Sequence, residues 1–261
     1  MTIRRTTPAI LFTLLFALLW SPAWAAGTCP ASTPDSTDTL PRVLIIGDSI
    51  SIGYTPIVQR VLRRHACVVH APGNNAFSAH GLAHAADWVG DHEWHVIYFN
   101  HGIWDVQWLA GRHLVRAPGG TEARIGAPFV NFATLYFGPW QRRSTPAEYL
   151  SNLNGIVDIL LPKTQQVIFA TTTQWTRYGA DTAELIKRNN AAARDLMHQR
   201  GVPVDDLYAV ALPHLTTWHS ADGLHFNERG NEGLGAQVAR TIAGALANQI
   251  QRSKDFDRRD E

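Results

Sequence analysis

The stretch Arg42-Val-Leu-Ile-Ile-Gly47-Asp48-Ser49-Ile50-Ser51 decides the fold. Its first five residues are a short apolar run rich in β-branched side chains, which is typical of a buried strand in a parallel sheet. Gly47 permits a tight turn, and residues 51–65 then carry apolar side chains at helical spacing. The stretch therefore predicts a strand, a glycine turn and a helix, with Ser49 at the junction.

The same alternation continues along the chain. Apolar runs predict further strands at 67–70, 95–100, 166–171 and 202–204, and periodicity predicts helices at 81–89, 146–161, 182–200 and 231–251. This order indicates an α/β fold: a single-domain three-layer α/β/α sandwich around a central, mostly parallel five-stranded sheet of flavodoxin-like type. With no internal repeat or linker in view, we assign residues 41–250 to one domain and 251–261 to a charged tail.

Residues 106–145 interrupt this alternation. They have no clean periodicity, and they contain an aromatic run consisting of Phe129, Phe132, Tyr136, Phe137 and Trp140. The segment follows the third predicted strand and so leaves the carboxyl edge of the sheet, where open α/β folds bind ligands. We interpret it as a lid or substrate wall. The alternative is an insertion whose aromatic side chains only pack on the body of the protein.

Residues 1–25 have the pattern of a secretory signal peptide. Arg4 and Arg5 precede an apolar run, and Ala23-Trp24-Ala25 offers a small-x-small cleavage site. The apolar run is shorter than the roughly 20 residues that span a bilayer, so we expect no stable membrane anchor after cleavage. The protein is then exported, either periplasmic or secreted, with residues 26–40 as an exposed leader.

Composition and cysteine content restrict the partners. The chain has 23 Lys+Arg against 22 Asp+Glu and no strongly basic stretch, so we expect no nucleic-acid partner. Its two cysteines, Cys29 and Cys67, both follow the predicted cleavage site. In an oxidising compartment a disulfide between them is favoured over a metal site, because one pair supplies at most half of a tetrahedral zinc site.

A second motif stands before the last predicted helix, in Ser220-Ala-Asp222-Gly-Leu-His225-Phe-Asn227. A serine at a strand–helix junction is often only a helix cap, and an aspartate near a histidine can be a cap beside a surface side chain. Together the residues also match the nucleophile, general base and orienting acid of a serine triad.

Gly-Asp-Ser-Ile followed much later by Asp-Gly-Leu-His resembles the SGNH, or GDSL, hydrolase superfamily, over residues 42–246. The resemblance implies that Ser49 is the nucleophile, His225 the base and Asp222 its orienting partner. It also implies oxyanion donors in two further blocks. Gly73 occupies the position of the first of these blocks, as a backbone N–H donor.

The other block departs from the superfamily's common Gly-x-Asn-Asp pattern. The chain has Asn100-His-Gly102-Ile-Trp104-Asp105, so Trp104 takes the asparagine position if the glycine and aspartate align. Some branches of the superfamily instead carry the asparagine two residues before the glycine. Asn100 is therefore the candidate donor; the alternative is that it satisfies backbone groups at the strand end.

Asn75, Trp104 and Trp175 are candidates for the substrate wall, since tryptophan faces can stack on sugar rings. They can equally be core or rim fillers. Asn75, or its neighbour Asn74, is also the alternative to Gly73 as an oxyanion donor.

The resemblance implies an esterase that forms an acyl-serine intermediate and needs no metal or organic cofactor. We expect small acyl esters, acetyl first, on a small-molecule or polysaccharide substrate. The alternatives are an acyltransferase, a lipase or thioesterase of the same superfamily, and an inactive glycan-binding module. His80 and His84 have a helical metal-ligand spacing, but with no third ligand in view we expect a surface or packing role.

Overall fold

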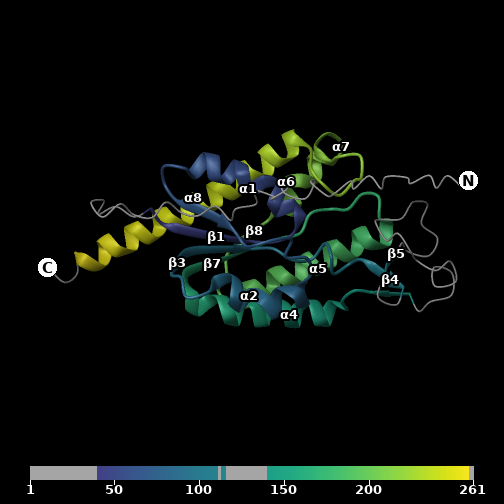
Figure 1. Cartoon of the computed structure of the whole chain (residues 1–261), viewed down its shortest axis with the longest axis horizontal. Coiled ribbons are helices and arrows are strands. Elements are labelled where there is room, and N and C mark those ends of the chain that lie inside the picture. The colour runs from purple at the N-terminus through teal and green to yellow at the C-terminus, as the bar shows by residue number, and fades with distance from the viewer. Residues whose placement is uncertain (1–39, 111–112, 116–139, 259–261) are drawn as a thin grey trace, which may run out of the picture.

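The computed structural model describes residues 40–110, 113–115 and 140–258. A five-stranded sheet lies between two layers of helices (Figure 1). Its strands, in the order in which they lie in the sheet, are β2 (Cys67–His70), β1 (Arg42–Ile46), β3 (Trp94–Phe99), β7 (Thr164–Ala170) and β8 (Val204–Asp205). All four strand pairs are parallel. The predicted fold class is confirmed.

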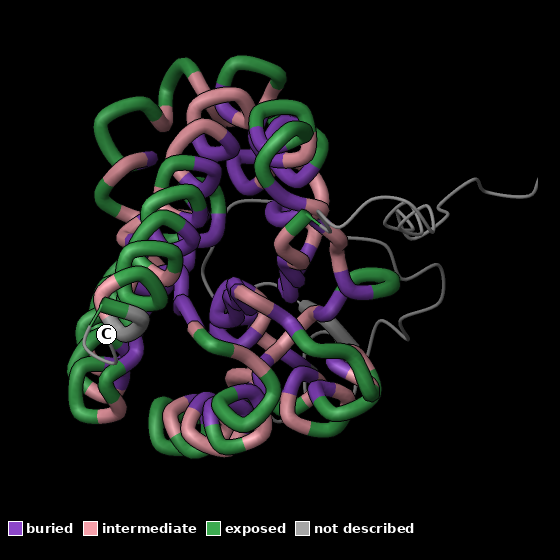
Figure 2. The backbone as a smooth tube through the Cα atoms, turned by 90° about the vertical axis from the view of Figure 1, so that its left-hand side faces the viewer, coloured by how far each residue is buried: buried purple, intermediate pink, exposed green. Residues whose placement is uncertain are grey.

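Alternate side chains of the strands enter two separate cores. Val43 and Ile45 of β1 face the layer with α1 (Ser49–Leu62) and α8 (Glu228–Asp257). Leu44 and Ile46 face α2 (Ser78–Val89) and α4 (Pro146–Leu160), beside which lies α5 (Ala180–Gln199). Burial is concentrated on the sheet and on the helix sides turned toward it (Figure 2). Apolar strands buried on both faces are the reason for the continuous hydrophobic runs in the sequence.

Two element boundaries differ from the predictions for identifiable reasons. The fifth strand starts at Val204 and not at Val202, because Pro203 has no N–H to donate to the ladder, although its carbonyl accepts a bond from Phe169. Helix α2 starts at Ser78, three residues before the predicted start, because the Asp105 carboxylate accepts the Ser78 N–H at 3.0 Å.

The described part of the 106–145 segment forms a second, antiparallel sheet that the sequence did not predict. Its strands are β4 (Trp108–Ala110), β5 (His113–Val115) and β6 (Trp140–Arg142), with β4 in the middle. The Arg142 guanidinium lies 4.1 Å from the centroid of the Trp108 ring. Residues 111–112 and 116–139, with most of the aromatic run, lie outside the described residues, so the lid stays a prediction.

Short helices that the sequence did not predict complete the fold. The 3₁₀ turn η1 (Leu161–Lys163) follows α4, and three elements follow β8: α6 (Leu207–Ala211), the 3₁₀ turn η2 (Leu212–His214) and α7 (Leu215–Trp218). Helix α8 runs on to Asp257, so the segment assigned to a charged tail begins inside this helix.

The predicted signal peptide, leader and Cys29 lie outside the described residues. Cys67, the first residue of β2, is disulfide-bonded, which agrees with the predicted bridge, although its pairing with Cys29 stays a prediction. Within the described ranges, no helix is both long and apolar enough to cross a bilayer.

Candidate active site

The turn between β1 and α1 presents Ser49. Asp48 is the N-cap of α1 and accepts the Ile50 N–H at 2.9 Å, which makes Ser49 the first residue of the helix. A side chain at Gly47 would collide with Ser51, since a Cβ there would lie 2.7 Å from its Oγ. The turn therefore requires glycine, and Ser49 lies half-buried at the carboxyl edge of the sheet.

Ser49, His225 and Asp222 are joined by hydrogen bonds in series. His225 Nε2 lies 2.8 Å from Ser49 Oγ, and His225 Nδ1 lies 2.5 Å from Asp222 Oδ2. Because an ionised carboxylate only accepts hydrogen bonds, Nδ1 carries the proton, which leaves Nε2 free to accept the serine proton. This is the geometry of a serine nucleophile with an oriented base.

The Asp222 carboxylate is held in its ionised form. Its partial burial would raise the pKa, but the hydrogen bond with His225 and the N–H groups of Leu224 and His225 outweigh this, so that the pKa lies below its usual value. Both backbone donors lie 3.0 Å from Oδ1. The side chains of Asp222 and His225 are 44% and 43% exposed, so the base lies in an open site.

The loop that carries this pair is fixed at both ends and in the middle. The Ser220 N–H donates to the His225 carbonyl at 2.7 Å, which closes the loop on itself. The Thr176 N–H donates to the Gly223 carbonyl at 2.9 Å, so the loop after β7 supports it from the side. Gly223 has a φ of 66°, a left-handed conformation that favours glycine.

The two predicted oxyanion donors lie in different surroundings. Gly73 is exposed on the loop after β2, with a φ of 71°. Asn100 is only 7% exposed, and its Nδ2 donates to the Ala170 carbonyl at 2.6 Å. The Asn100 side chain therefore ties the end of β3 to β7, as in the alternative interpretation, and one amide hydrogen remains for an oxyanion.

Two of the three predicted substrate-wall residues are buried, and that prediction is wrong for them. Asn75 has no exposed surface: its Oδ1 accepts the Gly47 N–H at 2.9 Å and its Nδ2 donates to Pro72. The Asn75 side chain therefore supports the turn between β1 and α1 that presents Ser49. Trp175 is 2% exposed and stacks on Tyr178 with ring centroids 4.1 Å apart.

Trp104 remains a candidate for the substrate wall, because it is half-buried at the carboxyl edge. The Arg143 guanidinium lies 5.6 Å from the Trp104 ring centroid and 4.6 Å from that of Phe77, and its Nε donates to the Trp104 carbonyl at 3.1 Å. Sequence reasoning missed Arg143, because nothing in its local pattern places it against a loop about 40 residues earlier in the chain.

Asp105, the last residue of the third block, has a structural task that sequence reasoning also missed. It is 1% exposed and accepts hydrogen bonds from the Ser78 N–H and hydroxyl and from the Ser144 hydroxyl, the last at 2.6 Å. It thereby joins the start of α2 to the chain that enters α4. A buried carboxylate with this many donors holds the block in place.

A second serine–histidine contact lies beside the nucleophile turn. His70 Nε2 is 2.7 Å from Ser51 Oγ, and Ser51 Oγ also lies 2.7 Å from the Asp48 carbonyl. Burial lowers the pKa of His70, which favours a neutral ring. Asp48 is fully buried as well, and this burial raises its pKa to about 6. The end of β2 therefore supports the serine turn through Ser51.

The described residues hold no group of three or more histidine, cysteine, aspartate or glutamate side chains arranged for a metal ion. His80 and His84 pack against each other on α2 with ring centroids 4.4 Å apart, and Trp88 continues the row.

A doubly wound sheet with serine, histidine and aspartate in series at its carboxyl edge has the arrangement of a class, the serine hydrolases of α/β fold. The chain belongs to the GDSL-like lipase/acylhydrolase family, whose model matches residues 45–232. It is an enzyme that hydrolyses ester bonds.

Several solved structures share this fold. The lipase/acylhydrolase from Enterococcus faecalis matches with 22% identity and a TM-score of 0.58, covering 78% of this chain and 96% of the other. The acetyl xylan esterase AlAXEase has 14% identity, a TM-score of 0.55 and coverages of 77% and 99%. An acetyl xylan esterase variant from Geobacillus stearothermophilus has 16% identity, a TM-score of 0.54 and coverages of 79% and 94%. In a comparison with curated protein sequences, none matches this chain.

Proposed function

We propose that the protein is an exported serine esterase that removes small acyl groups, acetyl first among them, from carbohydrate esters. The observation that carries the proposal is the unbroken hydrogen-bond series from Asp222 through His225 to Ser49. Each member is held by the backbone around it: Ser49 by the capped start of α1, and the other two by a loop bonded to itself.

In the proposed reaction, His225 Nε2 takes the Ser49 proton as Oγ attacks the ester carbonyl carbon. The tetrahedral intermediate places its negative charge toward the N–H groups of Ser49 and Gly73 and the remaining amide hydrogen of Asn100, where the dipole of α1 also favours an anion. The intermediate then expels the alcohol, which receives the proton from His225, and the acyl group stays on Ser49. Water, deprotonated by the same nitrogen, releases the acid and restores the serine.

Asp222 stays ionised throughout and stabilises the imidazolium that forms twice in each cycle. Its lowered pKa keeps the carboxylate charged across the neutral range. The exposed position of the pair also gives water direct access to the acyl-serine, which favours hydrolysis over transfer to another alcohol.

Three observations support a carbohydrate ester as the substrate: the names of solved structures with this fold, the predicted export of the protein and the position of Trp104. Two of the solved structures with this fold are named as acetyl xylan esterases. An exported enzyme meets polysaccharides outside the cytoplasm. Trp104 lies half-buried at the carboxyl edge, where an aromatic face suits a sugar ring.

Hydrolysis of p-nitrophenyl esters from acetate to octanoate tests the acyl specificity, using the protein from Ala26 onward with Ser49→Ala as control. We expect Ser49-dependent turnover that falls beyond acetate or butyrate, and Ser49-dependent release of acetate from acetylated xylan. A rise with chain length would instead favour a lipase or thioesterase. Transfer of acetyl to an added sugar in preference to water would favour an acyltransferase.

Expression of the full chain in a bacterial host tests export. We expect the protein outside the cytoplasm, with a mass that corresponds to a first residue Ala26. Recovery of uncleaved protein in the cytoplasm would contradict this part of the proposal.

A further inference from the structure

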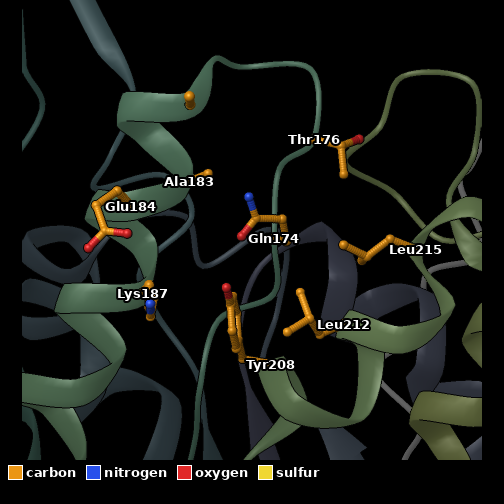
Figure 3. Close-up of a pocket in the computed structure, with 9 residues that line it drawn as sticks. Gln174, Thr176, Ala183, Glu184, Lys187, Tyr208, Leu212 and Leu215 are labelled. Atoms are coloured by element: carbon orange, nitrogen blue, oxygen red, sulfur yellow. The ribbon is translucent and has the colours of Figure 1, made fainter.

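A pocket of about 350 Å³ lies beside the catalytic loop, and the proposed reaction does not use it (Figure 3). It opens between the start of α5, the loop after β7 and the short helices that follow β8. Its walls are formed by Gln174, Thr176, Ala180, Ala183, Glu184, Lys187, Tyr208, Leu212 and Leu215.

One polar group in the wall of this pocket has no hydrogen-bond partner among the described residues. The Oε1 atom of Gln174 is shielded from solvent and has no hydrogen-bond partner among the described residues. Figure 3 shows the Tyr208 hydroxyl directed toward the Gln174 amide from below. A buried carbonyl oxygen without a donor is unfavourable, and a ligand that brings a donor removes this cost. Because Oε1 is shielded in this conformation, a ligand hydroxyl pairs with it only when the terminal amide turns toward the pocket, and Gln174, half-buried in the pocket wall, is placed for that.

The chemistry of the walls selects a neutral, hydroxyl-rich ligand. Glu184 and Lys187 project from the same wall, so their opposite charges leave no net preference for an anion or a cation. A hydroxyl both donates and accepts hydrogen bonds, and so matches an amide and a phenol in any orientation. Leu212 and Leu215 form an apolar wall opposite α5, suited to the C–H face of a sugar ring.

The pocket is connected to the catalytic loop through Thr176. This residue lines the pocket, yet its N–H and hydroxyl both donate to the Gly223 carbonyl, between Asp222 and His225. Ser49 follows β1, whereas the pocket lies beside the ends of β7 and β8, two to three positions away in the sheet, or about 9–14 Å at the usual strand spacing. One oligosaccharide chain can cover that distance, whereas an acetyl group or a single sugar cannot.

We infer that this pocket is a remote sugar-binding subsite, which holds the carbohydrate chain of the ester several residues from the acyl group under attack. The inference rests on the proposed function and extends it from the acyl group to the alcohol part of the substrate. It implies an enzyme that favours acetylated oligosaccharides over acetylated mono- or disaccharides.

The test compares substrates of two lengths. Acetate release is measured from acetylated xylobiose and acetylated xylohexaose, with p-nitrophenyl acetate as a substrate too short to reach the pocket. Gln174→Ala and Tyr208→Phe remove the proposed contacts. Gln199→Ala is the matched control, because Gln199 is exposed at the opposite end of α5.

We expect each pocket variant to raise KM for the hexasaccharide about three- to tenfold, the effect of one lost hydrogen bond. The disaccharide, p-nitrophenyl acetate and the Gln199→Ala control should be unchanged. Equal losses on all three substrates would show that the variants disturb the catalytic loop, and would overturn the inference. Unchanged KM for the hexasaccharide would overturn it as well.

A binding measurement separates this inference from the proposed function. Unesterified xylohexaose is titrated into Ser49→Ala, with and without Gln174→Ala. Weaker binding in the double variant supports the subsite even if acetate release fails, whereas absence of any binding overturns it. Failure of Ser49-dependent acetate release from both oligosaccharides counts against the proposed function alone.

Discussion

Replacing Asp222 by asparagine separates the orientation of His225 from the shape of its loop. The side-chain oxygen of asparagine can still accept the N–H groups of Leu224 and His225, which lie 3.0 Å from Oδ1. The asparagine NH₂ group then replaces Asp222 Oδ2, which lies 2.5 Å from His225 Nδ1, so that a donor faces the ring nitrogen. The ring must then place its proton on Nε2, where it can no longer accept the Ser49 proton.

The size of the effect follows from the exposure of the pair. A hydrogen bond to a charged group contributes about 1.5–3 kcal/mol, which corresponds to roughly 10- to 150-fold in rate. The wrong tautomer adds to this loss, and in the chymotrypsin triad, where the aspartate is buried, the same substitution costs about 10⁴-fold. Since Asp222 and His225 are both more than two-fifths exposed, water compensates in part, and we expect kcat/KM to fall about 100-fold.

The assay is p-nitrophenyl acetate hydrolysis across the neutral range, together with thermal unfolding. The chain provides its own control in Asp87, which lies 3.5 Å from His84 in another pair with the same i,i+3 spacing. Asp87→Asn should leave the rate unchanged, and neither variant should lower the melting temperature appreciably. A loss under about threefold in Asp222→Asn, or an equal loss in Asp87→Asn, would refute the assigned role.

Three further predictions concern the surroundings of the serine. Burial raises the pKa of Asp48 to about 6, so the folded state binds a proton more tightly than the unfolded state. The free energy of unfolding should therefore fall by about 3 kcal/mol as the pH rises from about 4 to 6. Denaturant unfolding of Asp48→Asn should show a weaker pH dependence than that of the unchanged protein. The same pH dependence in both proteins would contradict the raised pKa of Asp48. Ser51→Ala removes the hydrogen-bond partner of His70 Nε2 and should lower the free energy of unfolding, measured in urea, by about 1–3 kcal/mol. An unchanged urea midpoint would contradict this prediction. Asn100→Ala should lower kcat about 100- to 1000-fold if its free amide hydrogen reaches the oxyanion; an effect under threefold with reduced thermal stability would leave it only its bond to Ala170.

Most of the fold could be predicted from the sequence, because its deciding signals are local. A β-branched run that is buried on both faces, as in Val43 to Ile46, has few alternatives to a parallel strand. The meeting of Ser49, Asp222 and His225 could be predicted because they stand in two short motifs that resemble those of the SGNH superfamily. The β4–β5–β6 sheet could not, because its strands are only three residues long and β6 joins β4 from the far end of the 106–145 segment.

The errors at the site concern which way a side chain points. Trp175 and Asn75 lie on loops at the carboxyl edge, as expected, but loop sequences carry no periodicity that tells the inner side from the outer. Their burial follows from long-range partners: Tyr178 for the tryptophan ring and the Gly47 N–H for the asparagine oxygen. Asn100 was ambiguous for the same reason, and the structure shows one of its partners.

The bond between Ser49 and His225 joins positions separated by 176 residues. Such a contact closes almost the whole domain into one loop, so we expect it to form only after α8 has packed on α1 and both helices lie on the completed sheet. We therefore expect a chain that lacks the last helix to lose the contact between these two side chains. Recovery of esterase activity during refolding should therefore lag behind recovery of helix content. The rate at which activity returns then reports the rate of the final folding step.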